Sequence, residues 1–340
     1  MIEASPSTQQ TTLGEKRRLA MRIVRTIVPI LLLGAVLWTT NWPHLLKCTR
    51  AADPRLLVAA FSVYLAAVLV QGWRWHVLAR SDGGHWPLWR MQRVNFVSMF
   101  FDSFTPGKLG SDAYRLATFR HTGRMHHLVV SLLALRLHGM AMSFVVAAVV
   151  GTIVLSFKHG WTRVALPAAV ATALLIPVLM KSYSSIRKGT LHLKYNKRGL
   201  IQYAAAQLSK AHDAIKAMFS DPRTLHESNI LALIYTLLLV TTYWLTGLAF
   251  GMTLPFQNYL AVVPLLILAS VLPITIQGRG LTEVIAIGVW QGRRASQEQI
   301  LLTCLSVFAI MVLQGLIGGV IWVVTRTRSG TDGQPEQTAK

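Results

Sequence analysis

Two short segments combine helix-breaking residues with charged residues in an otherwise apolar chain. The first, 104–115, holds the breaks Pro106, Gly107 and Gly110 and the charges Lys108, Asp112 and Arg115. Proline and glycine interrupt a helix and free backbone amides that can face an anion. On a helix that restarts after the break, Asp112 and Arg115 share a face and can pair. The segment predicts a cradle for a phosphate headgroup; the alternative is a loop with a surface ion pair.

The second segment, 272–283, repeats this composition. It holds the breaks Pro273, Gly278 and Gly280 and the charges Arg279 and Glu283. The two charges are four residues apart and can pair on a helix. Charges between long apolar runs are costly in lipid and mark function by default. The alternative is a buried pair that locks the local structure.

A third candidate lies inside a long apolar run. Arg136 has no acidic neighbour in the sequence, and Asp112 is a plausible partner for it. A charge inside a membrane span must face a partner or water. His138 lies nearby, and we interpret it as a hydrogen-bonded structural residue in preference to a proton relay. The predicted substrate-binding residues are therefore Lys108, Asp112, Arg115, Arg136, Arg279 and Glu283.

These candidates belong to a membrane protein. The chain has 340 residues, 53% of them hydrophobic and only 14% charged, where soluble domains carry about 25% charged residues. Its net charge of +21 is assigned to cytoplasmic loops and anionic lipid, since no nucleic-acid-binding motif is present. Cys48 and Cys304 are expected to be free thiols. Motifs for catalysis, metal binding and nucleotide binding are missing, so we expect neither an enzyme nor a cofactor.

The apolar runs predict an all-α polytopic bundle with about six full spans and two re-entrant broken helices. The full spans are expected at 23–40, 56–78, 128–155, 164–180, 230–250 and 301–325, each near the 20 residues that a bilayer requires. Two shorter runs, 92–104 and 259–290, contain the two breaks. Interrupted helices at membrane depth must be buried in protein or line a cavity. The alternative is eight ordinary spans with kinks.

The charges predict the orientation. Most of the 34 Lys and Arg residues fall in segments that are cytoplasmic if both termini are cytoplasmic, including 74–124 and 181–228. The two broken helices then enter from opposite sides, as in inverted-repeat transporters. We expect a tail 1–22, a transmembrane domain 23–325 and a tail 326–340. The domain divides into halves 23–180 and 229–325, joined by an amphipathic cytoplasmic linker 181–228.

At the two breaks the sequence resembles the lysylphosphatidylglycerol synthase transmembrane-region family of flippase-like proteins. Its first signature is matched by Phe100, Phe101, Ser103, Phe104, Pro106, Gly107, Gly110, Asp112 and Arg115, with Asp102 where Asn is usual. Arg136 and Gly139 match the next piece, with Leu135 in place of an Asp. The second signature is matched by Pro273, Thr275, Gly278, Gly280 and Glu283, while Gln277 and Arg279 depart from it.

The resemblance implies lipid translocation in a bacterial inner membrane, with an anionic phospholipid, a glycolipid or a hopanoid as partner. Because the chain ends soon after its last predicted span, we expect it to resemble the flippase half of the two-domain members alone. Another possibility is a non-catalytic membrane partner that scaffolds a lipid-modifying or glycosyl-transferring enzyme. In that case the basic segment 181–228 would be the docking surface.

Overall fold

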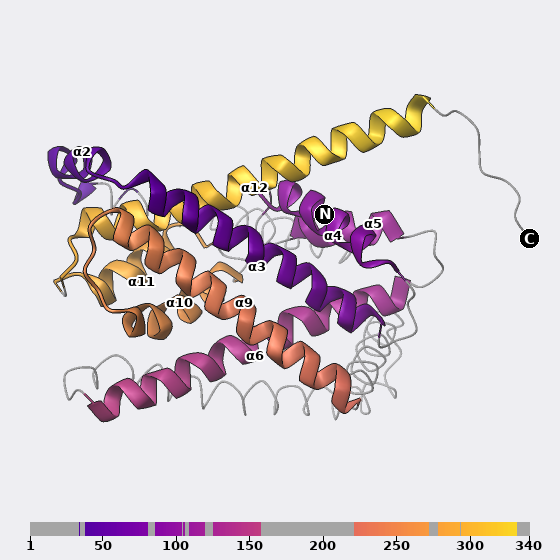
Figure 1. The fold of residues 1–340 in the computed structure, drawn as a ribbon, viewed down its shortest axis with the longest axis horizontal. Helices are drawn as coiled ribbons and strands as arrows, with labels where there is room; N and C mark the ends of the chain where they lie inside the picture. The colour runs from indigo at the N-terminus through magenta and orange to yellow at the C-terminus, as the bar shows by residue number, and fades with distance from the viewer. Residues whose placement is uncertain are drawn as a thin grey trace, which may run out of the picture.

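The computed structural model describes residues 34, 38–80, 86–103, 105, 109–119, 125–157, 221–271, 278–292 and 294–331. All regular secondary structure in this part of the chain is helical (Figure 1). Its helices are α2 (Trp42–Arg50), α3 (Pro54–Arg80), α4 (Leu88–Asp102), α5 (Leu109–Phe119), α6 (Met125–Phe157), α9 (Pro222–Ala249), α10 (Phe256–Val271), α11 (Leu281–Trp290) and α12 (Gln297–Thr331).

Four helices are long and apolar enough to cross a membrane. They are α3, the segment Leu128–Val149 of α6, α9 and the segment Gln297–Thr325 of α12, which correspond to four of the six predicted full spans. The predicted spans 23–40 and 164–180 lie almost wholly outside the described residues. The chain is therefore a helical, multi-pass membrane protein.

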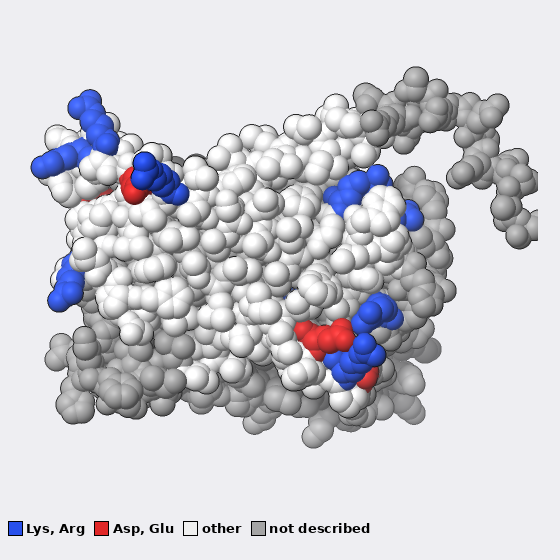
Figure 2. Space-filling model, in the orientation of Figure 1, with Lys and Arg blue, Asp and Glu red and all other residues white. Residues whose placement is uncertain are grey.

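The surface of the bundle agrees with this assignment. Apolar side chains point outward along the long helices, for example Val58 of α3 and Val320 of α12, which are 66% and 64% exposed. Figure 2 shows an uncharged band across the molecule with the Lys, Arg, Asp and Glu side chains of this face gathered at its two ends. Such a band is what hydrocarbon requires of the surface it contacts.

The two halves have the same plan in opposite directions. In each, a long helix is followed by a broken pair and a second long helix: α3, α4–α5, α6 and then α9, α10–α11, α12. In Figure 1, α3 and α12 run from left to right, whereas α6 and α9 run from right to left. The pairs α4–α5 and α10–α11 lie toward opposite ends of the molecule. The predicted inverted repeat is thus visible in the helix directions.

Both broken pairs are interrupted near the predicted residues. Gly278 and Gly280 adopt φ values of 81° and 85°, a region that side chains with a Cβ rarely occupy. Gly110 lies where an added Cβ would approach the carbonyl oxygen of Phe101 to 2.6 Å. The predicted breaks Pro106, Gly107 and Pro273, and the predicted ligand Lys108, lie outside the described residues.

Close helix contacts and polar side chains hold the bundle together. Gly318 of α12 packs so tightly against α4 that an added Cβ would collide with the carbonyl oxygen of Phe96. Asn95 of α4 and Gln314 of α12 donate to backbone carbonyls of α3, at 3.2 Å and 3.0 Å. Small residues and interhelical hydrogen bonds are the usual means of association where hydrophobic burial gives little driving force.

The start of α9 differs from the predicted domain boundary. The second half was expected to begin at residue 229, after a linker 181–228. Instead α9 begins at Pro222, and the Asp221 carboxylate caps it by accepting from the backbone N–H groups of Arg223 and Thr224. The Thr224 hydroxyl also donates to the Asp221 carboxylate. This hydrogen bond, followed by those from the backbone N–H groups, lowers the pKa of Asp221. A proline in the first turn after an Asp cap favours this start. The rest of the predicted linker, 181–220, lies outside the described residues.

Candidate functional site

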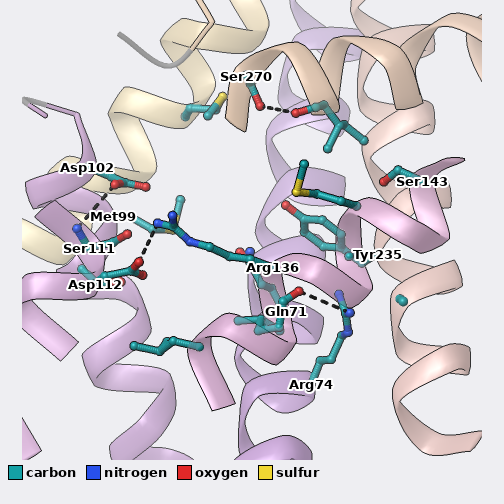
Figure 3. Close-up of a pocket in the computed structure, with 18 of the residues that line it drawn as sticks. Gln71, Arg74, Met99, Asp102, Ser111, Asp112, Arg136, Ser143, Tyr235 and Ser270 are labelled. Carbon is teal, nitrogen blue, oxygen red and sulfur yellow. Dashed lines mark hydrogen bonds and ion pairs between the residues drawn. The ribbon is translucent and has the colours of Figure 1, made fainter. Parts of the chain in front are cut away.

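A polar cavity lies inside the bundle, between α3, α4, α5, α6, α9 and the end of α10 (Figure 3). Its volume of about 110 Å³ has room for several water molecules or a small polar headgroup. The polar and charged residues that line it are Tyr64, Gln71, Arg74, Ser98, Asp102, Ser103, Ser111, Asp112, Arg115, Arg136, Ser143, Tyr235, Thr236 and Ser270. Apolar side chains such as Met99 and Met311 complete the wall.

An ion pair joins α5 and α6 at this cavity. Nη2 of Arg136 lies 2.6 Å from Oδ2 of Asp112, and each side chain is about a quarter exposed. In Figure 3 the Arg136 side chain extends across the cavity to reach Asp112. The prediction that Asp112 is the partner of Arg136 is confirmed. Helix α5 starts at Leu109, and this start places Asp112 on the turn that faces α6.

Arg115 is also at the cavity but is held more rigidly. Its guanidinium donates to Oδ1 of Asn95 at 2.5 Å and to Oγ of Ser98 at 3.2 Å, and it lies 4.9 Å from the ring centroid of Trp75. Asp112 is 3.9 Å away. Because the amide nitrogen of Asn95 donates to the α3 backbone, its Oδ1 atom is the one that faces Arg115. Arg115 therefore fixes α5 against α3 and α4 while contributing positive charge to the cavity.

The first turn of α5 is capped from α4. The backbone N–H of Ser111 donates to Oδ1 of Asp102 at 3.4 Å, and that of Gly110 donates to the Thr105 hydroxyl at 2.8 Å. Asp102 stands where the family usually has Asn, and either side chain can accept at a helix start. The break therefore ends in an ordered helix start beside Asp112.

The second break does not bring its charged residues to this cavity. Nη1 of Arg279 lies 2.6 Å from Oε1 of Glu283 and 3.1 Å from the backbone oxygen of Cys304 on α12, and the guanidinium stacks over Phe308 at 4.3 Å. Oε2 of Glu283 accepts from the N–H of Gly280 at 2.8 Å. Arg279 and Glu283 do not line the cavity, so this geometry favours the alternative of a buried pair that locks α11 against α12.

The end of α10 is the part of the second pair that reaches the cavity. Ser270 lines it, and an added Cβ on Gly278 would lie 2.7 Å from the Ser270 Cα. The glycine break therefore packs against the residue that faces the cavity. The first break thus brings Asp112 and Arg115 to the cavity, whereas α10 contributes Ile267 and Ser270, which precede the second break. Residues 272–277 of that break lie outside the described residues.

Several cavity residues were not predicted. Arg74 was assigned with the cytoplasmic segment 74–124, but it lies inside the bundle and is only 3% exposed. Gln71, one turn earlier on α3, and Tyr235 of α9 also face the cavity. A signal was present, since Gln71 and Arg74 are three residues apart at the end of an apolar run and share a helix face. The helix simply continues to Arg80, beyond the predicted span.

Among the described residues, no group of three His, Cys, Asp or Glu side chains could hold a metal ion. The chemistry available at the cavity is therefore that of charged and hydrogen-bonding side chains: three guanidinium groups, two carboxylates, hydroxyls and an amide. Such a set suits the binding of a polar, charged group inside an apolar bundle.

Comparison with known proteins agrees with the fold and the motifs. No curated protein sequence matches the chain. The family model described as lysylphosphatidylglycerol synthase TM region matches residues 22–319, which include every described helix except the last turns of α12. The chain belongs to the lysylphosphatidylglycerol synthase transmembrane-region family.

Proposed function

We propose that this protein binds the headgroup of a phospholipid in the cavity and moves the lipid between the two leaflets of a bacterial inner membrane. The observation that carries the proposal is the Asp112–Arg136 ion pair, which spans a polar cavity inside an apolar bundle. A membrane protein tolerates buried charges where they bind a substrate or line its pathway. The family connects the chain to lipid-related processes.

The Asp112–Arg136 ion pair allows a phosphate to replace a carboxylate as the partner of Arg136. Arg136 can bind a phosphate oxygen in place of the Asp112 carboxylate, because both are anionic acceptors of comparable geometry. When the phosphate leaves, Asp112 neutralises Arg136 again and the cation is never left alone in the bundle. The contact between α5 and α6 would open and close in step with headgroup binding.

The inverted repeat supplies the motion. Two halves of the same plan and opposite direction can rock about a site between them, which exposes that site to each side in turn. The broken pairs α4–α5 and α10–α11 contribute Asp112 and Ser270 to the cavity. With both termini proposed to be cytoplasmic, the ends of α3 and α9 at Arg80 and Glu227 face the cytoplasm.

We propose no catalytic step. The cavity carboxylates Asp102 and Asp112 contact a backbone amide and a guanidinium, which is an arrangement for holding charge in place. A general acid–base pair would instead need two groups placed on either side of one reacting bond. Binding and translocation therefore account for the site without chemistry.

Reconstituted vesicles test the proposal. The purified protein is placed in vesicles that contain fluorescent phosphatidylglycerol, and a membrane-impermeant quencher measures how fast inner-leaflet lipid reaches the outer leaflet. We expect wild-type protein to accelerate this exchange. Replacing Arg136→Gln removes the charge while keeping hydrogen-bonding capacity, and should slow exchange by about tenfold or more, as expected for losing a charged hydrogen bond.

The matched control is Arg80→Gln. Arg80 is half exposed and pairs with Glu227 at the end of the bundle, so this change removes one arginine outside the cavity and should leave the rate unchanged. Wild-type vesicles that exchange lipid no faster than protein-free vesicles would contradict transport. Equal rates for Arg136→Gln and wild type would contradict the role of the ion pair.

A further inference from the structure

Arg74 differs from the other arginines inside the bundle in its partners. Arg136 and Arg279 each lie 2.6 Å from a carboxylate oxygen, and Arg115 lies 3.9 Å from one. Arg74 is 3% exposed and, among the described residues, forms no ion pair. Asp112, the nearest acid by motif, is bound to Arg136 instead. The cavity therefore contains a buried cation whose charge no described side chain balances.

The groups that hold Arg74 are all neutral. Its Nε donates to Oγ of Ser228 at 3.4 Å, and its Nη2 lies 2.6 Å from Nδ1 of His138 and 3.5 Å from the backbone oxygen of Leu135. Nε2 of His138 lies 2.7 Å from Oδ1 of Asn229. A guanidinium can only donate, so Nδ1 of His138 must accept and the ring proton must be on Nε2, where Asn229 accepts it. His138 is thus a neutral clamp, which agrees with the structural role predicted for it.

The hydrogen bonds to Nε and Nη2 leave the Nη1 edge of the Arg74 guanidinium facing the cavity. Nη1 of Arg74 has no hydrogen-bond acceptor among the described residues. It lies 3.3 Å from the position of a Cβ added to Gly139, another cavity-lining residue. Because Gly139 has no side chain, the space in front of Nη1 stays open. Figure 3 shows Arg74 at the cavity on a different helix from the Asp112–Arg136 pair.

A buried guanidinium without a counter-charge is expensive. Two neighbouring helices, α6 and α9, nevertheless supply its neutral partners, so the site holds the cation in one orientation. A guanidinium fixed in this way is well suited to a phosphate, because the two N–H bonds of Nη1 have no acceptor among the described residues and can donate to phosphate oxygens, and the positive charge strengthens those hydrogen bonds. The missing negative charge would then come from the ligand.

We propose that Arg74 is an anion-binding residue of the cavity, which receives a phosphate ester through the edge that carries Nη1. A lipid headgroup and free inorganic phosphate share this chemistry. The apolar bundle around the cavity favours the lipid, and that choice of source rests on the proposed function. Arg74 is therefore a second contact for the phosphate, separate from Arg136, and it needs no carboxylate to move aside.

Lipid binding to the purified full-length protein in neutral detergent tests this inference. Native mass spectrometry counts the phosphatidylglycerol molecules bound at increasing lipid concentration, with diacylglycerol as the phosphate-free comparison. We expect Arg74→Gln to bind phosphatidylglycerol about tenfold or more weakly than wild type, as for losing a hydrogen bond to a charged group. Diacylglycerol should bind both proteins equally. Arg80→Gln, on the same helix, should bind phosphatidylglycerol as wild type does.

Two further comparisons decide whether the bound phosphate belongs to a lipid or is free phosphate, and whether Arg74 binds it. If millimolar inorganic phosphate displaces the lipid in wild type, the site takes free phosphate and the lipid source is overturned. Wild-type affinity in Arg74→Gln would overturn the anion site. If Arg74→Gln does not accumulate, Arg74→Lys decides. Lysine keeps the charge but lacks the planar guanidinium that His138 and Ser228 hold in place, so it should bind with intermediate affinity. Wild-type affinity there would also overturn the site.

This measurement does not depend on transport. Arg74-dependent binding by a protein that fails to move lipid in vesicles would leave the anion site intact and remove the proposed function. If Arg74→Gln exchanges lipid at the native rate and binds phosphatidylglycerol as wild type does, the anion site is removed and the proposed function remains. The two proposals can therefore fail separately.

Discussion

Arginine–carboxylate pairs with the same spacing have different surroundings in this protein. Arg279–Glu283 and Arg223–Glu227 are both four residues apart in the sequence, with closest contacts of 2.6 Å and 3.0 Å. Glu283 is completely buried and also accepts from Gly280, whereas Arg223 is 81% exposed. Removing one partner of a buried pair leaves an uncompensated charge, but an exposed pair contributes little.

We therefore expect Glu283→Gln to destabilise the protein by about 3 kcal/mol or more, and Glu227→Gln to change the free energy of unfolding by less than about 1 kcal/mol. Thermal unfolding of both variants in the same detergent measures the difference. Phosphatidylglycerol binding by folded Glu283→Gln should match wild type, because Glu283 does not line the cavity. Equal unfolding temperatures for the two variants would show that the buried pair does not lock α11.

The sequence predicts some site residues well and others poorly, for a physical reason. Asp112 and Arg136 could be paired because a deep arginine demands an acid, and the motif offers one. The second segment has a similar composition, with Arg279 and Glu283. Its Arg279 side chain nevertheless packs against α12 and not into the cavity, and the sequence does not show which way a side chain points. Arg74 was missed because residues 74–124 were counted as a cytoplasmic segment, although Arg74 also falls within the predicted span 56–78 and is buried in the bundle.

At the scale of the helix, glycines mark where two backbones come close. Gly318 faces the Phe96 carbonyl of α4, whereas Gly288 on α11 has no atom within 4 Å of an added Cβ. We expect Gly318→Ala to separate α12 from α4 and lower the unfolding temperature, since neither backbone can yield cheaply. Gly288→Ala should leave it unchanged or raise it, because alanine is favoured over glycine in a helix by up to about 1 kcal/mol. A loss of stability in Gly288→Ala as large as in Gly318→Ala would contradict close packing at Gly318 as the cause.

The helices themselves follow from the sequence more fully than their boundaries do. Runs of apolar residues of membrane length predicted α3, α6, α9 and α12, and the Pro–Gly segments predicted where α4–α5 and α10–α11 are interrupted. The start of α9 was misplaced because charged residues near Arg223 were taken as linker. Asp221 and Pro222 are the local signals that begin the helix there, and they precede the apolar run by two turns.

For the whole molecule, the inverted repeat and the charge bias predict which end faces which side. In Figure 1, α2 lies at the end of the molecule opposite the C-terminal end of α3 and the N-terminal end of α9. Cys48 of α2 should therefore react with an impermeant thiol reagent in intact cells. A cysteine placed by Arg223→Cys in a Cys48→Ser background should react only after the membrane is opened. Burial, and then the charge of Glu298, raises the pKa of the Cys48 thiol, so mildly alkaline labelling is required.

The native Cys304 serves as the internal control for this labelling. It is a residue of α12 and is fully buried, so it should stay unreacted in both preparations. Labelling of Arg223→Cys in intact cells, in the Cys48→Ser background, would reverse the proposed orientation. The proposed lipid-binding cavity would be unaffected, but the ends of the bundle assigned to the cytoplasm and to the outside would be reversed.

The central claim is that a lipid headgroup enters the cavity while the acyl chains stay outside the bundle. Phosphatidylglycerol carrying a photoreactive group on its headgroup, compared with the same group at the end of an acyl chain, tests this most directly. After irradiation of the protein in membranes, mass spectrometry locates the modified residues. We predict headgroup crosslinks at cavity residues such as Met140, Tyr235 and Ser270, and acyl-chain crosslinks at outward-facing residues such as Val58 and Val320. Headgroup crosslinks confined to the outward-facing residues would contradict the account.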